Sequence, residues 1–521
     1  MGRCFGCKKR SSTIVTFVIG TFAVISLLYS ISNQRKLELN SVIGIEKRGE
    51  ESHLQDTEPF DAEFIKNSEN GEFTGKRSNP STSVESQRNP ISKVYRHEES
   101  FNISMQQLYT RLEQEVYNIP IKYWKTVESK LSKMNLRPGC AQMPNIFELS
   151  FDNSLWQLFE ATNATFYIYS AHLDNRALVP NATIRILSMT HVLNPRQNAF
   201  CQLWYEGTTN PVIVPVMNYN HMWGSRLGTS QKLQPYMIEC QLPLLDGSQA
   251  APVAVSVVEQ ECDIALNLIK VVYNPREPRK NQTLAVCVKR FHHVHDEPVF
   301  NMIEYLELVR ILGAEKVYIY ILEPQPNPKI ERIIKYYEVQ GFLEVSRITI
   351  PGKRPNSPIL RHLYLDHYRH LEWILELIPA DDCLLKNLHR HDLLAMTDFD
   401  EGQSEWNPEI PERMTWLNNV KRFVQISKPG TLLKTFMNTS DVLKAHSHAA
   451  LDCVGNKCHV CHVPVTIGVS HHYKSVGDGQ MKMQPDPKNF STVEDLRLWH
   501  FKEELIPRYQ QAVSDLGFDL L

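Results

Sequence analysis

The sequence has no excess of charge of either sign. Its 521 residues include 56 lysines and arginines against 58 aspartates and glutamates, which gives a formal net charge of −2. A nucleic-acid-binding protein usually shows a marked basic excess, so the composition gives no support to a nucleic-acid partner. The sequence also contains no internal repeat, which argues against an architecture built from copies of one unit.

Charged residues are missing altogether between Ser11 and Gln34. The apolar centre of this stretch, residues 13–31, is close to the roughly 20 residues that cross a bilayer core. Basic residues within 3–10 favour a cytosolic N-terminus. A cleaved signal peptide is the competing interpretation, but the apolar stretch is longer than a typical signal core and no clear cleavage site follows it. We therefore predict a cytoplasmic tail at 1–12 and an uncleaved signal-anchor at 13–31.

Aromatic residues are scarce in the next segment, residues 32–103, which is rich in Glu, Ser, Asn and Lys. Such a composition buries too little apolar surface to fold, so we predict a flexible stem. Everything after the anchor should then be lumenal, in agreement with six Asn-x-Ser/Thr glycosylation sequons. These sequons begin at Asn102, Asn163, Asn181, Asn281, Asn438 and Asn489.

Nine cysteines lie in the predicted lumenal part, at positions 140, 201, 240, 262, 287, 383, 453, 458 and 461. Disulfides are the default state in an oxidising lumen. The number is odd, so at least one cysteine is free or pairs between chains. The cluster Cys453–His462 has the ligand types of a zinc site, but the oxidising compartment favours a disulfide with incidental histidines.

Residues 104–278 are predicted to contain an entering helix and a β-rich domain. Apolar residues at 108, 112 and 116 recur at helical spacing, and Pro120 ends or kinks that helix. Strand-like runs follow at 165–171, 184–187, 212–216 and 253–258. Few segments with helical periodicity intervene, so we expect a small sandwich-like domain in front of the next domain.

From residue 279 the pattern changes to alternating strands and helices. Strands are expected at 284–288, 316–321, 342–348 and 393–397, and helices at 299–312, 329–337 and 359–378. This alternation implies a parallel sheet with helices on both faces. Ligands of such sheets bind outside the carboxyl ends of the strands. We therefore predict an α/β ligand-binding domain over 279–521.

The strand expected at 393–397 leads directly into Asp398-Phe-Asp400. Side chains at i and i+2 of a strand point to the same face, so Asp398 and Asp400 should converge where the strand leaves the core. Two convergent carboxylates bind a hard divalent cation such as Mg²⁺ or Mn²⁺, which can hold a diphosphate. A solvated turn is the alternative for any Asp-x-Asp triplet, but the position at a strand end favours a metal site.

Short blocks between about residues 280 and 480 occur in a characteristic order. They are Cys287-Val-Lys-Arg, Asp296-Glu297-Pro, the run from Ile303 to Tyr320, Asp382-Cys383-Leu384, Asp398-Phe-Asp-Glu401 and Ser470-His-His-Tyr-Lys474. Their order and spacing resemble glycosyltransferase family 92. The upstream block Tyr169-Ser-Ala-His-Leu-Asp-Asn-Arg176 is similar to one seen in animal members.

The resemblance implies a GT-A type, Rossmann-like catalytic domain that depends on a metal and a nucleotide-sugar donor. Characterised members are galactosyltransferases that use UDP-galactose and form β-linkages on glycoprotein glycans. By position, Asp398 and Asp400 would hold Mn²⁺ (or Mg²⁺) and the UDP-sugar, and His472 would be a further metal ligand. Lys474 stands where the family more often has Arg, so its contact to the donor phosphates would be a point charge. Gly402 replaces the usual aromatic residue after the motif.

An inverting transfer also needs a carboxylate that takes the proton of the acceptor hydroxyl. The sequence leaves Glu401, Asp441 and Asp452 as candidates, each with a solvated or capping role as the alternative. Asp382 is a candidate for holding the donor nucleotide, with an ordinary helix-end or loop acid as the equal alternative.

These features together predict a single-pass type II enzyme of the Golgi membrane, with a lumenal catalytic domain that transfers galactose from UDP-galactose to a glycoprotein glycan. Transfer from another UDP-sugar, such as UDP-GlcNAc or UDP-glucose, is the first alternative. The second is a catalytically silent, lumenal glycan-binding protein of the same fold. The presence of Asp398, Asp400 and His472 argues against a silent protein.

Overall fold

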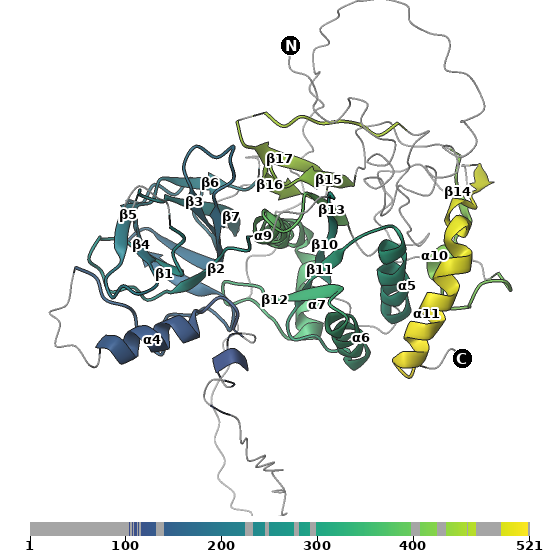
Figure 1. The fold of residues 1–521 in the computed structure, drawn as a ribbon, viewed down its shortest axis with the longest axis horizontal. Coiled ribbons are helices and arrows are strands. Elements are labelled where there is room, and N and C mark those ends of the chain that lie inside the picture. Colours follow the sequence, from purple (N-terminus) through teal and green to yellow (C-terminus); the bar gives the residue numbers. More distant parts are fainter. Residues whose placement is uncertain are drawn as a thin grey trace, which may run out of the picture. The chain divides into compact units, whose positions relative to one another are not determined.

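A computed structural model of the chain describes most residues between 104 and 518 (Figure 1). The described ranges are 104, 107, 109–111, 113, 116–131, 140–223, 233–244, 250–275, 281–291, 298–397, 407–424, 434–446, 448–455, 457–464 and 491–518. The predicted tail, signal-anchor and stem lie outside these ranges. Within them, none of the helices has the length and apolar character that a bilayer span requires.

The first half of the described chain is dominated by one nine-stranded sheet with the order β5-β4-β8-β9-β2-β3-β7-β6, in which β1 also pairs with β2. Its strands are β1 (Gln157–Ala161), β2 (Ala164–Asp174), β3 (Thr183–Thr190), β4 (Phe200–Trp204), β5 (Val212–Pro215), β6 (Asn218–His221), β7 (Gln234–Gln241), β8 (Ala254–Val258) and β9 (Ile269–Val272). All neighbouring strands are antiparallel except β2 and β9. The four strands expected from the sequence correspond to β2, β3, β5 and β8.

In place of the predicted sandwich-like domain, the structure has a single sheet that curls around its own core. Cys201 of β4 and Cys240 of β7 are joined by a disulfide with a Cα–Cα distance of 6.4 Å, although the two strands lie far apart in the strand order. Alternate residues of many strands fill the enclosed core, among them Phe166, Ile168, Ile184, Ile186, Val255 and Val257. The sequence shows the strands and their period of two, but a sandwich and a curled sheet share that pattern.

Helix α4 (Ile121–Leu131) precedes this sheet. Pro120 stands directly before it, and its carbonyl oxygen accepts a hydrogen bond from the Trp124 amide at 2.9 Å. Described residues between 107 and 113 are also helical, as the sequence predicted. Pro120 therefore introduces a second helix that the sequence reading missed, which agrees with the tolerance of helix starts for proline.

The second half contains a five-stranded sheet with the order β12-β11-β10-β13-β15 (Figure 1). Its strands are β10 (Leu284–Phe291), β11 (Lys316–Leu322), β12 (Leu343–Ile348), β13 (Leu393–Thr397) and β15 (Thr435–Asn438). The first four are parallel, and β15 is antiparallel to β13. This confirms the predicted α/β alternation and the parallel sheet.

Helices cover both faces of this sheet because successive strand residues point in opposite directions. Helices α5 (Pro298–Ile311), α6 (Pro328–Val339), α10 (Thr415–Asn418) and α11 (Lys502–Asp515) share a core with the even-numbered positions 284, 286 and 288 of β10. Helices α7 (Pro358–His367), α8 (Arg369–Leu375) and α9 (Leu377–Asn387) share a second core with positions 285 and 287. The single long helix expected at 359–378 is therefore wrong. Its apolar spacing runs across both junctions, so the sequence shows no break.

Local signals explain the ends of two correctly predicted helices. Helix α5 is followed by Gly313 with φ of 91°, a left-handed conformation that favours glycine at a helix C-terminus. Helix α6 starts at Pro328, and the side chain of Asn327 accepts a hydrogen bond from the Lys329 amide at 2.9 Å. Asparagine and proline at these positions cap and pre-form a helix start.

The block Tyr169–Arg176 joins the curled sheet to the α/β half. The hydroxyl of Tyr169 donates to the carbonyl oxygen of Arg347 at 2.9 Å. Ser170 and His172, two residues apart on β2, both contact one carboxylate oxygen of Asp382 on α9, at 2.6 and 2.9 Å. The block is therefore a polar seam between the halves.

Asp174 extends this seam as the centre of a buried charge network. Its carboxylate accepts from Arg176 and Arg185, in each case at 2.8 Å. Arg176 also donates to the carbonyl oxygens of Thr439 and Val442 at 2.6 and 2.7 Å. Burial by itself would raise the pKa of Asp174, but the two arginines lower it to about 2. Asp174 is therefore charged throughout the physiological range.

Asp381, the neighbour of Asp382 on α9, is buried without a cation in contact. One of its oxygens accepts from the Ala445 amide at 2.6 Å, in the hairpin of β16 (Val442–His446) and β17 (Ala449–Cys453). The other oxygen has no hydrogen-bond partner among the described residues. Burial raises the pKa of Asp381 to about 8, so this carboxyl is mostly uncharged at neutral pH.

Four disulfides confirm the expected oxidised cysteines. They join Cys140 to Cys262, Cys201 to Cys240, Cys287 to Cys383 and Cys453 to Cys458. The last pair agrees with the preference for a disulfide over a zinc site in that cluster. Cys461 is exposed and lies outside these four pairs.

We expect Asp174→Ala to lower the free energy of unfolding by about 3–5 kcal/mol, because it leaves Arg176 and Arg185 buried without their shared carboxylate. Asp366→Ala is the control, since the Asp366–Arg369 ion pair is exposed and should contribute less than about 1 kcal/mol. Chemical denaturation followed by tryptophan fluorescence measures both variants. Equal losses in the two variants would contradict the assignment of the network.

The raised pKa of Asp381 predicts a pH-dependent contribution to stability. The folded chain keeps this proton up to about pH 8, whereas the unfolded chain loses it near pH 4. The contribution is therefore fully present below pH 4 and is lost as the pH rises through 8. Asp381→Asn keeps an acceptor for the Ala445 amide and cannot ionise. Its melting temperature should rise relative to the parent between pH 5 and pH 9 in a fluorescence melting series, and a constant difference would refute the raised pKa.

Candidate functional site

The strand order of the parallel sheet reverses between β10 and β13. The chain proceeds from β10 to β11 and β12 on one side, and returns to place β13 on the other side of β10. Ligands of open parallel sheets bind at such a reversal, outside the carboxyl ends of the strands. This point is therefore the candidate functional site.

The acidic motif begins at this reversal. Thr397 is the last residue of β13 and pairs with Val288 of β10. Asp398 is the next residue along the chain, so the register of the two strands determines where the motif starts. Asp398, Asp400 and Glu401 themselves lie outside the described residues.

The end of β10 carries two basic residues, Lys289 and Arg290, to which the sequence alone assigned no role. Lys289 and Arg290 directly follow Val288, and their strand lies beside β13. The segment Val288–Phe291 pairs with Ile319–Ile321 of β11, so β10 contains one extra residue there. Bulges of this kind are common next to active sites, where they redirect a side chain. In the sequence, they could have been recognised as two cationic residues directly after the apolar run 284–288.

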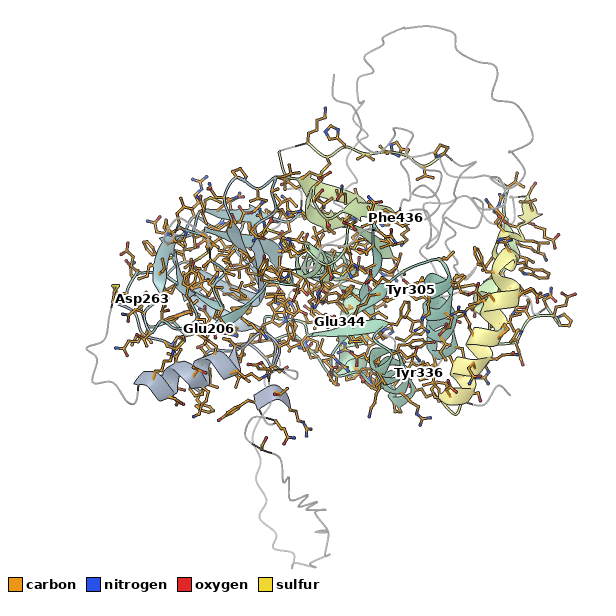
Figure 2. All side chains as sticks on the ribbon, in the orientation of Figure 1. Glu206, Asp263, Tyr305, Tyr336, Glu344 and Phe436 are labelled. Carbon is orange, nitrogen blue, oxygen red and sulfur yellow. A yellow bond between two sulfur atoms is a disulfide. The ribbon has the colours of Figure 1, made fainter. Side chains whose placement is uncertain are left out.

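Helix α5 holds Thr397 in place through a hydrogen bond. Its hydroxyl and that of Tyr305 lie 2.6 Å apart, and both residues are buried. Figure 2 shows Tyr305 on α5, and it labels Phe436, which belongs to the neighbouring strand β15. The residue directly before the acidic motif is therefore held by a buried hydrogen bond.

Asp441 lies near the amino end of β13, whereas the acidic motif follows its carboxyl end. Because β15 is antiparallel to β13, Thr435 pairs with Met396 and Asn438 pairs with Leu393. Asp441 comes after Asn438, so it is separated from the motif by the length of β13, roughly 15 Å. A carboxylate at that end of β13 is too far from the start of the motif to take the proton of the acceptor hydroxyl. Asp441 is therefore not a candidate for the catalytic base.

Asp452 belongs to the hairpin that contacts the curled sheet. It lies on β17 and forms an ion pair with Lys444 at 3.1 Å. Lys444 also donates to the side chain of Asn220 on β6 at 2.9 Å. This arrangement gives Asp452 a structural partner. Glu401 remains as the candidate base that is adjacent to the motif in sequence.

Asp382 lies in the interior of the protein and is not exposed to solvent. Its two oxygens contact Ser170, His172 and Tyr320 at 2.6–2.9 Å, and Lys386 lies 3.6 Å away. Burial alone would raise the pKa of Asp382, but Lys386 and His172 hold it well below the usual range. The carboxylate is enclosed and fully partnered, so it has no oxygen left for a donor nucleotide. The role in holding the donor nucleotide that was expected for Asp382 does not fit this enclosed position.

The described part of the chain contains no metal-binding cluster of its own. Among those residues, no group of three or more His, Cys, Asp or Glu side chains is placed to hold a metal ion. Asp398, Asp400, His472 and the predicted phosphate contact Lys474 lie outside the described ranges. The structure thus places Thr397, the residue that directly precedes the motif, at the end of β13.

The comparison with protein families agrees with this site. The model of glycosyltransferase family 92 matches residues 282–402. No curated protein and no solved structure matches the chain. The matched segment contains the four parallel strands, helix α5 and the acidic motif, which are the parts that build the carboxyl edge. The segment 282–402, which builds this edge, therefore belongs to glycosyltransferase family 92.

Proposed function

We propose that this glycosyltransferase is metal-dependent and transfers galactose from UDP-galactose, in β-linkage, to a glycoprotein glycan in the Golgi lumen. Family membership supports glycosyl transfer. The observation that carries the rest is the start of Asp398-Phe-Asp400 immediately after β13, where the strand order reverses. The domain of 279–521 is in this proposal a GT-A type nucleotide-sugar domain.

The residue types at the motif suit a metal-bound diphosphate. Asp398, Asp400 and His472 supply two carboxylates and one imidazole, which together fit Mn²⁺ better than Ca²⁺. A bound Mn²⁺ would stabilise the negative charge that develops on the diphosphate. Lys474, together with Lys289 or Arg290, would neutralise further phosphate charge.

The transfer itself requires one proton acceptor. The acceptor hydroxyl oxygen forms a bond to the anomeric carbon, and the bond from that carbon to the diphosphate oxygen breaks. UDP leaves with the electron pair, and the hydroxyl proton passes to a carboxylate, for which we propose Glu401. Attack from the face opposite the leaving group converts the α-linked donor into a β-linked product.

We expect Asp400→Ala to reduce Mn²⁺-dependent release of UDP by at least about 100-fold, because one of the two carboxylates at the motif is lost. The full-length protein in detergent is assayed with UDP-galactose, UDP-GlcNAc and UDP-glucose, with and without Mn²⁺. UDP-galactose should give the fastest release, and the melting temperature of the variant should match the parent.

Asp366→Asn, an exposed acid on α7, serves as the control and should retain full activity. Full activity of Asp400→Ala, or of the parent in excess EDTA, would sink the metal-dependent mechanism. A faster release from another UDP-sugar would replace the donor assignment. Absence of UDP release from every donor would favour the silent glycan-binding alternative.

A lumenal C-terminal half should carry N-linked glycan. Asn438 is exposed at the end of β15 and begins the sequon Asn438-Thr-Ser440. We expect treatment with an N-glycosidase to increase gel mobility, and Asn438→Gln to remove the mass of one glycan. An unglycosylated protein whose C-terminal half is digested by protease added outside intact microsomes would refute the type II topology.

A further inference from the structure

Helix α5 carries a buried polar face within an otherwise apolar surface. Asn301, Glu304 and Tyr305 are 8%, 0% and 0% exposed. Their spacing of i, i+3 and i+4 places them on one face of the helix. Apolar residues of α5 pack into the core on the same side of the sheet, so the helix is held firmly against the strands. The mechanism proposed above uses none of these three polar groups.

The first contact of this face is with the residue before the acidic motif. The hydroxyl groups of Tyr305 and Thr397 lie 2.6 Å apart, with Thr397 only 1% exposed. Water has no access to replace this hydrogen bond. Loss of either hydroxyl therefore leaves a buried polar atom without this partner, at a cost that water cannot offset.

The other contacts are with the chain that follows the motif. The two carboxylate oxygens of Glu304 accept from the amides of Trp416 and Leu417 at 3.1 and 3.0 Å. The hydroxyl of Thr415 donates to the side-chain oxygen of Asn301 at 2.7 Å. The Glu304 carboxylate thus binds backbone groups whose positions depend on the path of the chain.

The ring of Trp416 also packs edge-on against Tyr305, with centroids 5.6 Å apart. Tyr305 therefore contacts both flanks of the motif, whereas Asn301 and Glu304 contact the downstream flank. Thr397 precedes Asp398 directly, and Thr415 to Leu417 follow Asp400 by 15 to 17 residues. A shift of either flank would break a buried polar contact with the same helical face.

We propose that Asn301, Glu304 and Tyr305 are positioning residues that hold the flanks of the Asp398-Phe-Asp400 motif in the geometry that binds the metal and the diphosphate. This inference rests on the proposed function, because it assigns the three residues to the same metal site. They act through Thr397 and the start of α10 and do not touch the donor themselves.

The test is direct Mn²⁺ binding to the full-length protein in detergent with UDP present, measured by the electron paramagnetic resonance signal of free Mn²⁺. Tyr305→Phe removes one hydroxyl and keeps the ring. We expect its dissociation constant for Mn²⁺ to rise about 3- to 10-fold, which corresponds to the loss of one buried hydrogen bond. In the UDP-release assay, the Mn²⁺ concentration for half-maximal rate should rise equally, with little change in kcat at saturating Mn²⁺.

Tyr337→Phe is the matched control. Tyr337 is also buried, and its hydroxyl donates to Glu307 of the same helix at 2.8 Å, without a contact to either flank. Its melting temperature should fall as much as that of Tyr305→Phe, while its Mn²⁺ affinity stays at the parental value. Thr397→Val and Thr397→Ser form a second pair, which lose and keep the hydroxyl partner of Tyr305. Only the valine variant should bind Mn²⁺ more weakly.

The outcomes separate the two proposals. Parental Mn²⁺ affinity in both Tyr305→Phe and Thr397→Val would overturn the positioning role and leave the metal site standing. Equal weakening in Tyr305→Phe and Tyr337→Phe would also overturn it, because the effect would then be general destabilisation. Absence of Mn²⁺ binding by the parent protein would overturn the metal site and the positioning role together.

Discussion

The parallel pairing of β10 with β13 is the constraint on which the candidate site depends. The pairing sets Thr397, the last residue of β13, opposite Val288 of β10. Asp398 begins an acidic stretch after Thr397, and the basic residues Lys289 and Arg290 follow Val288. The strand order reverses at this pair, which is where ligands of open parallel sheets bind. An acidic and a basic stretch of the sequence therefore begin directly after two paired residues, Thr397 and Val288.

Helix α9 couples this sheet to the curled sheet through two adjacent carboxyl groups with opposite behaviour. Asp382 is charged, because Lys386 and His172 offset the cost of burial. Asp381 is mostly neutral at pH 7, because burial raises its pKa and the hydrogen bond from the Ala445 amide offsets only part of that effect. The Cys287–Cys383 disulfide ties the same helix to β10. The seam therefore holds β10, the strand that borders the site, in place.

A buried polar side chain in this protein can serve to hold two segments of the chain together, even where its residue type suggests a role in catalysis or binding. Asp382 stood in a recognisable block and had the residue type of a ligand-binding acid, yet four side chains surround it in the interior. Glu304 and Tyr305 stood in another block and had no predicted role, yet they bind both flanks of the acidic motif. The presence of a residue in one of these sequence motifs does not show whether its side chain contacts a ligand or a neighbouring residue.

The sequence alone determined the four parallel strands and helices α5 and α6 of the α/β half, the oxidised cysteines and the placement of an acidic pair directly after a strand, because these follow from local periodicity, composition and chain order. Only the tertiary structure decided that the β-rich half is one curled sheet, that residues 359–378 belong to three successive helices, and that Asp441 lies across the sheet from the motif. Each of these depends on contacts between segments far apart in the chain. Such contacts leave no periodic signal, since a side chain that meets a distant carboxylate and one that meets solvent are the same letter in the sequence.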